Sequence, residues 1–264
     1  MFGKKKQAEE IVLREDGLTD YDVYVMTKSE KMFTIVAAAI ALFAVGYVFY
    51  HSLILSALLA LFAVKAPKIR TRQIIDKRKN QLSLQFKDML YSLSSALSVG
   101  KSVETGIRDS LQDLQVIYPD PETDILVELG LILRGLGMNN TIEDMFGQFA
   151  ERAHLEDIDN FVDIFVTCKR TGGDLIEVMR STSNTIGDKI EVKQEIETMI
   201  SGKKYEFNFL MILPVIMVLF LTLTSGDYMA PVFTTIVGRI AMTAAIAIFA
   251  LAYVVGSKIM KINI

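Results

Sequence analysis

Residues 32–64 read MFTIVAAAIALFAVGYVFYHSLILSALLALFAV and carry no formal charge over 33 positions. As one straight helix this block would be about 50 Å long at about 1.5 Å per residue, whereas the hydrocarbon core of a bilayer is about 30 Å thick. The sequence therefore predicts a transmembrane hairpin over 32–66, with two short spans at about 32–49 and 52–66 that turn near Tyr50-His51-Ser52. A single, steeply tilted helix is the alternative, because tilting also accommodates a long apolar stretch.

Two further apolar blocks lie near the C-terminal end. Residues 207–225 read FNFLMILPVIMVLFLTLTS, and residues 240–256 read IAMTAAIAIFALAYVVG. A spanning helix needs about 20 largely apolar residues, so both blocks qualify once their ends are included. They predict a second transmembrane hairpin over 207–257, closed by a short loop at 226–239. Pro214 lies inside the third span, where its missing N–H group predicts a kink in the membrane.

Basic residues beside the apolar blocks indicate which side of the membrane each flank occupies, because Lys and Arg are enriched in cytoplasmic loops. They precede the first block, follow it over 65–79, precede the third span at Lys203 and Lys204, and follow the last span at Lys258 and Lys261. All these flanks can be cytoplasmic only if the first block is a hairpin, which favours four spans. The sequence thus predicts a multi-pass protein of the cell inner (cytoplasmic) membrane with both termini in the cytoplasm.

The composition excludes several classes of function. The 264 residues are 51% apolar and 22% charged, with a net charge of -3, two His and one Cys. One Cys allows no disulfide framework and no Cys-rich zinc site, and two His leave little for a histidine metal centre. The near-neutral charge argues against nucleic acid as a partner. We predict no cofactor, no metal site and no catalytic residue, and we do not expect an enzyme.

Residues 67–206 have the pattern of successive amphipathic helices. Apolar residues recur at steps of three and four, as on the buried face of a helix. The six stripes are Leu82 to Leu97, Val103 to Leu114, Ile125 to Leu136, Ile142 to Phe149, Ile158 to Phe165, and Leu175 to Ile186. The predicted fold is therefore all-α: a cytosolic six-helix bundle between two transmembrane hairpins, with cytosolic segments at 1–31 and 258–264. The sixth helix continues toward the third span, so a push on the bundle could reach the membrane through a stiff rod.

Two glycine turns divide the predicted helices. Gly100 precedes Lys101-Ser102, and Gly172-Gly173 precede Asp174, a residue type that favours helix starts. The sequence around Gly100 ends like a phosphate-binding loop, but position 95 is Ser where that motif needs Gly, and a helix rather than a strand precedes it. We therefore interpret it as a turn between helices.

Three other features have ordinary structural explanations. Cys168 lies near an apolar stripe and is interpreted as a core or half-buried thiol. His51 is interpreted as a residue of the first membrane turn. The acidic cluster at 156–163 is interpreted as a solvated face, and a docking surface for a basic partner is its functional alternative.

Two segments carry a resemblance to a known family: LSSALSVGKSVE at 93–104 and CKRTGGDLIEV at 168–178. The first resembles the glycine-ended helix hairpin, and the second the TGG-acidic-Leu-x-x-Val turn, of the type II secretion system F-domain family. Their order around membrane hairpins resembles the TadB/TadC-like branch of that family. This branch comprises inner-membrane platform proteins of tight-adherence (Flp, type IVb) pili.

The resemblance implies a scaffold for pilus assembly. Such platforms lie beneath a growing filament, where a cytosolic secretion ATPase engages the cytosolic domain and pilin subunits leave the membrane. Larger relatives carry two copies of the domain, so we expect this chain to pair with itself or with a homologous platform protein. The expected partners are therefore the lipid bilayer, the ATPase, pilin subunits and a second platform chain. The candidate docking residues beside the two turns are Lys101, Glu104, Arg108, Lys169, Arg170 and Asp174.

Three alternatives stay open: a transporter or channel subunit, a membrane-bound enzyme or regulator, and the platform of a type II secretion or competence machine. The uncharged interiors of the last two spans argue against an ion path. The broken phosphate loop argues against nucleotide binding. The related machines are distinguished by their neighbouring genes rather than by this chain.

Overall fold

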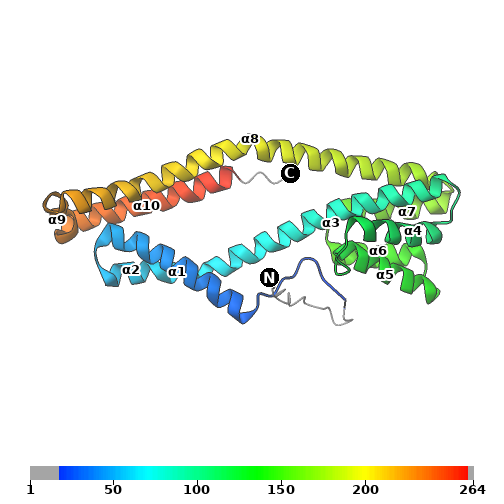
Figure 1. The fold of residues 1–264 in the computed structure, drawn as a ribbon, viewed down its shortest axis with the longest axis horizontal. Helices are drawn as coiled ribbons and strands as arrows, with labels where there is room; N and C mark the ends of the chain where they lie inside the picture. Colours follow the sequence, from blue (N-terminus) through cyan, green and yellow to red (C-terminus); the bar gives the residue numbers. More distant parts are fainter. Residues whose placement is uncertain (1–17, 261–264) are drawn as a thin grey trace. The chain divides into compact units, whose positions relative to one another are not determined.

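The computed structural model describes residues 18–260, and no β-strand occurs among them. The elements are α1 (Lys28–Tyr50), α2 (Leu53–Ala60), the short 3-10 helix η1 (Leu61–Lys65), α3 (Ala66–Ser98), α4 (Val103–Ile117), α5 (Asp124–Gly137), α6 (Ile142–Ala153), α7 (Glu156–Thr171), α8 (Leu175–Thr224), α9 (Gly226–Thr234) and α10 (Ile236–Ile259) (Figure 1). The prediction of an all-helical protein is confirmed.

The described chain divides into two units. The core unit comprises residues 18–26 and 71–192, and the span unit comprises residues 27–70 and 193–260. Helices α3 and α8 each contribute residues to both units. We describe each unit by itself.

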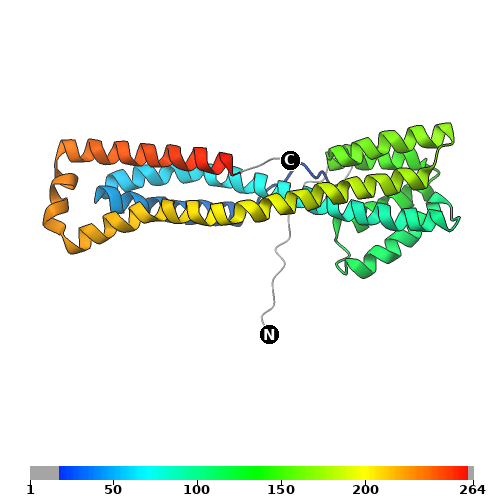
Figure 2. The same cartoon turned by 90° about the horizontal axis from the view of Figure 1, so that it is seen from above.

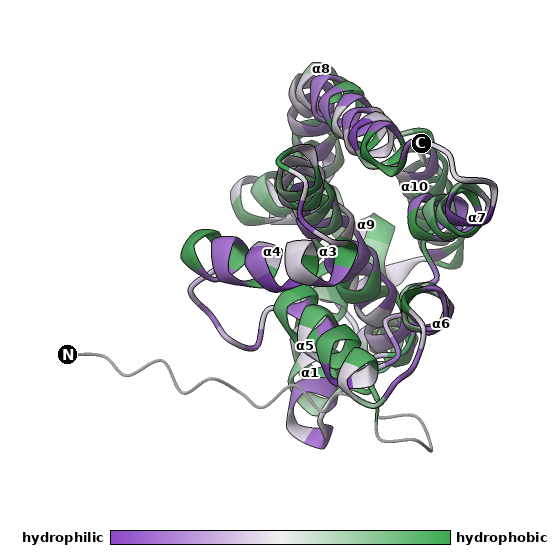
Figure 3. Ribbon diagram, turned by 90° about the vertical axis from the view of Figure 1, so that its right-hand side faces the viewer, coloured by the Kyte–Doolittle hydropathy of each residue, from purple (hydrophilic) through white to green (hydrophobic). Residues whose placement is uncertain are grey.

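An aromatic cluster lies at the centre of the core unit. Phe86 of α3 packs against Phe161 of α7 with ring centroids 5.4 Å apart, and Phe146 of α6 packs edge-on against Phe161 and Phe165 at 5.5 and 5.1 Å. These four side chains are fully buried. The helices around them carry both hydrophilic and hydrophobic residues, as amphipathic helices do (Figure 3). The apolar stripes read from the sequence supply most of this core.

Helix α8 is a single helix of 50 residues, Leu175–Thr224, in both Figures 1 and 2. It begins among the buried residues of the core unit, where Met179 and Ile186 are almost fully buried. Its C-terminal part is apolar enough to cross a membrane. The predicted continuation of the sixth helix into the third span is confirmed. Pro214 lies inside this helix, so the carbonyl of Leu210 lacks its usual helical donor.

Three helices of the described chain are long and apolar enough to span a bilayer: α1, α8 and α10. The predicted turn lies where the sequence placed it, since α1 ends at Tyr50 and His51 adopts a left-handed conformation with φ +46°. The predicted second span at 52–66 stays a prediction, because its residues form α2, η1 and the first residue of α3 instead of one long apolar helix. The same residues nevertheless fold back against α1.

The contact between α1 and α2 depends on small residues. A Cβ atom on Gly46 would lie 3.0 Å from the Cα atom of Ser56, which is itself fully buried. The Ser56 hydroxyl donates to the carbonyl of Ser52 at 2.7 Å, so its polarity is satisfied within its own helix. Small residues allow this close approach of helix backbones in a membrane.

The segment predicted as the loop 226–239 differs from that expectation. It contains the short helix α9, a break at Thr235 and the start of α10 at Ile236. The Thr235 hydroxyl accepts a hydrogen bond from the Gly238 N–H group at 3.1 Å and thereby caps α10. Sequence reasoning missed this cap because Thr235 precedes apolar residues, whose pattern was assigned to the span from residue 240 onward.

Candidate functional site

The first glycine turn joins α3 to α4. Gly100 has φ +83°, a left-handed conformation that favours glycine, and its N–H group donates to the carbonyl of Leu97 at 2.9 Å. The Ser102 hydroxyl then accepts a hydrogen bond from the Thr105 N–H group at 3.3 Å and caps α4. The turn thus ends one helix and starts the next, as the sequence predicted.

Three of the candidate docking residues follow this turn. Lys101 donates from Nζ to Oδ2 of Asp109 at 2.6 Å, while 46% of its side chain remains exposed. Glu104 and Arg108 are exposed on α4, one helical turn apart. The turn and the start of α4 therefore expose both signs of charge to solvent.

The second glycine turn joins α7 to α8. Gly172 has φ +75° and ends α7. The N–H group of Gly173 donates to the carbonyl of Cys168 at 2.8 Å. A Cβ atom on Gly173 would lie 2.7 Å from the Cys168 sulfur, so any larger residue would require this half-buried thiol to move. The interpretation of Cys168 as a half-buried residue is confirmed.

Asp174 has a structural role at the start of α8. Its Oδ1 atom accepts hydrogen bonds from the N–H groups of Ile176 at 2.9 Å and Glu177 at 3.1 Å. These are two of the N–H groups that a helix start leaves without a helical partner. A charge reversal at Asp174 would therefore damage the helix start as well as the surface charge.

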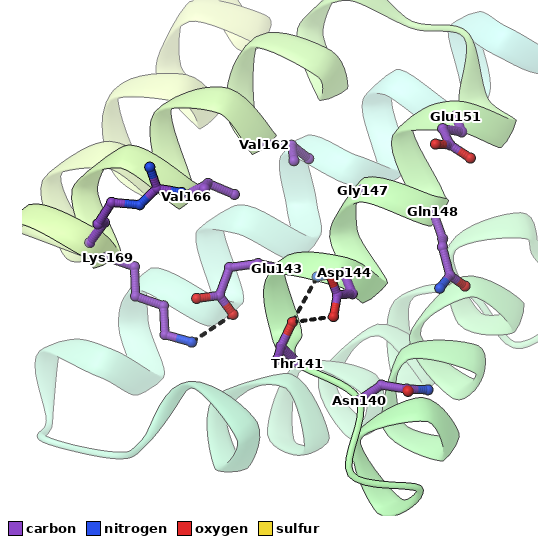
Figure 4. Close-up of a pocket in the computed structure, with 11 residues that line it drawn as sticks. Asn140, Thr141, Glu143, Asp144, Gly147, Gln148, Glu151, Val162, Val166 and Lys169 are labelled. Carbon is purple, nitrogen blue, oxygen red and sulfur yellow. Dashed lines mark hydrogen bonds and ion pairs between the residues drawn. The ribbon is translucent and has the colours of Figure 1, made fainter.

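Both turns lie at the same end of the core unit (Figures 1 and 2). An open groove of about 850 Å³ lies nearby between α6 and α7 (Figure 4), and its lining residues are Asn140, Thr141, Glu143, Asp144, Gly147, Gln148, Glu151, Val162, Val166, Lys169 and Arg170. The structure thus places Lys169 and Arg170 on a groove. Lys101, Glu104, Arg108 and Asp174 do not line it.

Charges of both signs line the groove. Lys169 donates from Nζ to Oε2 of Glu143 at 2.7 Å (Figure 4). This hydrogen bond holds the pKa of the Glu143 carboxyl below its usual value. Arg170 and Glu151 also line the groove and add one charge of each sign.

The acidic cluster at 156–163 has a local structural explanation. Glu156, Asp157 and Asp159 lie in the first turn of α7, where negative charge interacts favourably with the helix dipole. Asp157 also accepts a hydrogen bond from Lys189 of α8 at 3.0 Å. These contacts agree with the interpretation of the cluster as a helix start on a solvated face.

Sequence reasoning missed a buried polar cluster in the core unit. Glu128 of α5 and Arg152 of α6 are 0% and 2% exposed, and the guanidinium donates to both carboxylate oxygens. The Tyr21 hydroxyl donates to Oε1 of Glu128 at 2.9 Å. Burial raises the pKa of Glu128, although Arg152 and Tyr21 oppose that shift by stabilising the carboxylate.

A signal for this cluster exists in the sequence. Glu128 interrupts the apolar run ILVELGLIL, and Arg152 follows Phe149 by three residues on the buried face of its helix. A charged residue inside an apolar stripe needs a buried partner of opposite charge. The two residues could have been paired on that ground, but nothing local indicates that Tyr21, 107 positions before Glu128, completes the cluster.

No group of three or more His, Cys, Asp or Glu residues that could hold a metal ion occurs between residues 18 and 260. The features described above are two capped turns, a groove and a continuous helix.

Comparison with known families decides the assignment. The family described as type II secretion system (T2SS), protein F, matches residues 89–223, which is more than half of the chain. The chain belongs to this family. The matched range contains both glycine turns and most of α8. Proteins of the T2SS protein F family are platform-like membrane proteins of type II secretion and type IV pilus systems, and they are not enzymes. Together with the three apolar helices, membership indicates an inner-membrane protein. No curated protein and no solved structure matches the chain.

Proposed function

We propose that this T2SS protein F family member is the inner-membrane platform of a tight-adherence (Flp, type IVb) pilus, of the TadB/TadC-like kind. In this role a cytosolic secretion ATPase docks on the core unit, and movement of that unit assists pilin subunits in leaving the membrane. The platform itself breaks and forms no covalent bonds. A second copy of the chain, or a homologous platform protein, completes the assembly.

The observation that carries this proposal is the continuity of α8. Helix α8 starts in the core unit and continues without a break in its secondary structure into an apolar stretch long enough to span a bilayer. Its start is fixed by the Asp174 cap and by buried Met179 and Ile186. In the proposed mechanism, a force applied to the core unit reaches the membrane through this helix.

Contacts inside the core unit support the proposed topology. Residues 18–26 belong to the same compact unit as residues 71–192, which supports placing both on one side of the membrane. In the proposed topology, the chain between them crosses the bilayer an even number of times, or dips into it and returns. The antiparallel packing of α1 on α2 at Gly46 supports such a hairpin. Two further spans, α8 and α10, then return the C-terminus to the cytoplasmic side.

The two turns and the adjoining groove are the proposed ATPase-docking surface. Lys101, Glu104, Arg108, Lys169 and Arg170 supply the exposed charges, which give specificity to a transient contact. Asp174 contributes by holding the start of α8 in place. Docking at this end would act directly on α8 at its first turn.

Charge reversals test the docking surface. We expect Arg108→Glu and Arg170→Glu to abolish filament assembly and cross-linking to the ATPase, while the protein still folds and inserts. Glu122→Lys is the matched control, because Glu122 is exposed in the loop between α4 and α5, away from both turns. Asp174→Asn should preserve function, since Asn caps helices as well as Asp does. Normal filaments in both Arg variants would remove the turns from the proposed surface.

A platform for a related type II secretion or competence machine is the second candidate, because the matched family serves such systems as well. Cross-linking in native membranes followed by mass spectrometry separates the two. Capture of a type IVb pilin and its secretion ATPase supports the pilus platform. Capture of secretion or DNA-uptake components instead would identify the other machine.

A further inference from the structure

Residues 18–26, which precede α1, pack at a fixed position in the core unit. Residues 18–27 contain no helix, yet Tyr21 is 1% exposed and Met26 is 8% exposed. An irregular segment loses much conformational freedom when it is held in one place, so specific contacts must fix it. Tyr21 supplies most of these contacts.

Tyr21 is held in three ways. Its hydroxyl donates to Oε1 of Glu128 at 2.9 Å, and its N–H group donates to the carbonyl of Arg152 at 3.0 Å. The guanidinium of Arg78 lies over the ring, 4.8 Å from its centroid. The ring, the hydroxyl and the backbone are therefore each recognised by a different group, which is the pattern of a specific binding pocket.

The groups that contact Tyr21 are also bonded to other residues of the core unit. Glu128 and Arg152 join α5 to α6 through a buried ion pair. Arg78 of α3 is oriented by two hydrogen bonds to Asp124, at 3.0 and 2.6 Å. Three helices thus present a carboxylate, a carbonyl and a cation at fixed positions.

The residues on either side of Tyr21, Asp20 and Asp22, also contact the core unit. Lys79 donates to Asp22 at 2.5 Å, and this hydrogen bond lowers the pKa of the Asp22 carboxyl. On the other side, Nε2 of His154 lies 3.3 Å from Oδ1 of Asp20. These contacts are more exposed than those of Tyr21, and exposed ion pairs contribute little to stability. Tyr21 is therefore the main anchor of the segment.

We propose that residues 18–26 are a clasp that ties α3, α5 and α6 of the core unit to α1, with Tyr21 as its anchor and the Glu128–Arg152 pair as its receptor. Lys28, the first residue of α1, lies seven positions after Tyr21, and this stretch spans at most about 25 Å when extended. In this proposal, a rearrangement of α5 and α6 is passed through residues 22–27 to the start of α1. The clasp itself stands on the contacts above, whereas its part in filament assembly rests on the proposed platform function.

Hydrogen exchange of the full chain in lipid nanodiscs tests the clasp. In the wild type, peptides covering residues 18–26 should be protected, and Tyr21→Ala should raise their exchange about tenfold or more, because a hydrogen bond to a charged group and a buried ring are lost. Val23→Ala is the control, since that side chain is 41% exposed, and its exchange should stay close to wild type.

Tyr21→Phe keeps the test decisive even if Tyr21→Ala does not fold. It removes only the hydroxyl, and we expect exchange of the segment to rise about threefold or more while peptides of α3, α5 and α6 stay protected. Wild-type exchange as fast as that of an unstructured peptide would overturn the clasp, and so would unchanged protection in Tyr21→Phe.

Filament assembly then tests the coupling separately. If a Tyr21 variant shows raised hydrogen exchange in residues 18–26 and no longer assembles filaments, the result supports coupling through α1. An open clasp with normal filaments overturns the coupling role and leaves the platform function standing, because the Arg108 and Arg170 reversals test that function on their own.

Discussion

Replacing Arg152 by Met is the sharpest test of the core unit. The change keeps much of the side-chain volume but leaves the carboxylate of Glu128, which is 0% exposed, without its cation. Removing one partner of a buried ion pair costs about 3–5 kcal/mol, because the remaining charge is desolvated without compensation. Against a total stability of about 5–15 kcal/mol this is a large loss. The expected fall in melting temperature is roughly 6–20 °C.

Cys168 provides the assay. It is the only cysteine of the chain and is half-buried in α7, so a thiol-reactive fluorophore reports unfolding of the core unit in detergent micelles. Arg170→Met is the matched control: it removes an Arg that is exposed, and its melting temperature should change little, since such surface changes cost less than about 0.5 kcal/mol.

The pH dependence of the Arg152→Met variant has a definite sign. Burial already raises the pKa of Glu128 above the unfolded value of 4.5, and loss of Arg152 raises it further. A carboxyl with a raised folded pKa stabilises the fold at pH values below 4.5, and that contribution is lost as the pH rises through the folded pKa. The variant should therefore lose more stability relative to wild type at pH 8 than at pH 5. A loss no larger than that of Arg170→Met, or a loss that grows as the pH falls, would refute the buried ion pair as described.

Two further predictions concern glycine. Gly172→Ala should destabilise the core unit by about 1–2 kcal/mol, because the φ of Gly172 is +75°. Gly147→Ala should stabilise the core unit by about 0.5–1 kcal/mol, because Gly147 lies in the interior of α6 with open space around its Cβ position. The melting temperatures of the two variants should therefore shift in opposite directions. Gly46→Leu should destabilise the membrane hairpin by about 1–3 kcal/mol, because its side chain would meet the backbone of α2. Ala44→Leu on the exposed side of α1 should not, and equal melting temperatures for these two leucine variants would contradict the close packing.

Local patterns in the sequence predicted most of the helical architecture. The stripe from Leu82 to Leu93 is buried as expected, because helical periodicity reports directly on which face meets a core. Gly100 and Gly172 end helices in the left-handed conformation that their positions between stripes predicted. The candidate docking charges are also exposed, either in the two turns or on the helix ends beside them, since charged residues favour solvent.

Non-local features could not be predicted in the same way. The hydrogen bond between Tyr21 and Glu128 joins residues that are 107 positions apart in the sequence. No sequence periodicity predicts that an irregular segment binds in a pocket formed by three helices. The second arm of the first hairpin is divided between α2 and η1, and apolar composition gives no sign of that division, so its prediction as a full span stays a prediction. The groove beside Lys169 depends on how α6 and α7 pack, and that packing is likewise set by tertiary contacts.

Cysteine labelling in spheroplasts tests the central claim most directly, namely that the core unit and the segment before α1 lie on the cytoplasmic side and are joined to the membrane by helices that return there. In a Cys168→Ala background, single cysteines replace Val23, Arg170 and Asp227, all of which are exposed. A membrane-impermeant maleimide should label position 227 in intact spheroplasts, and positions 23 and 170 only after the membrane is opened. Labelling of positions 23 and 170 from opposite sides would contradict the account.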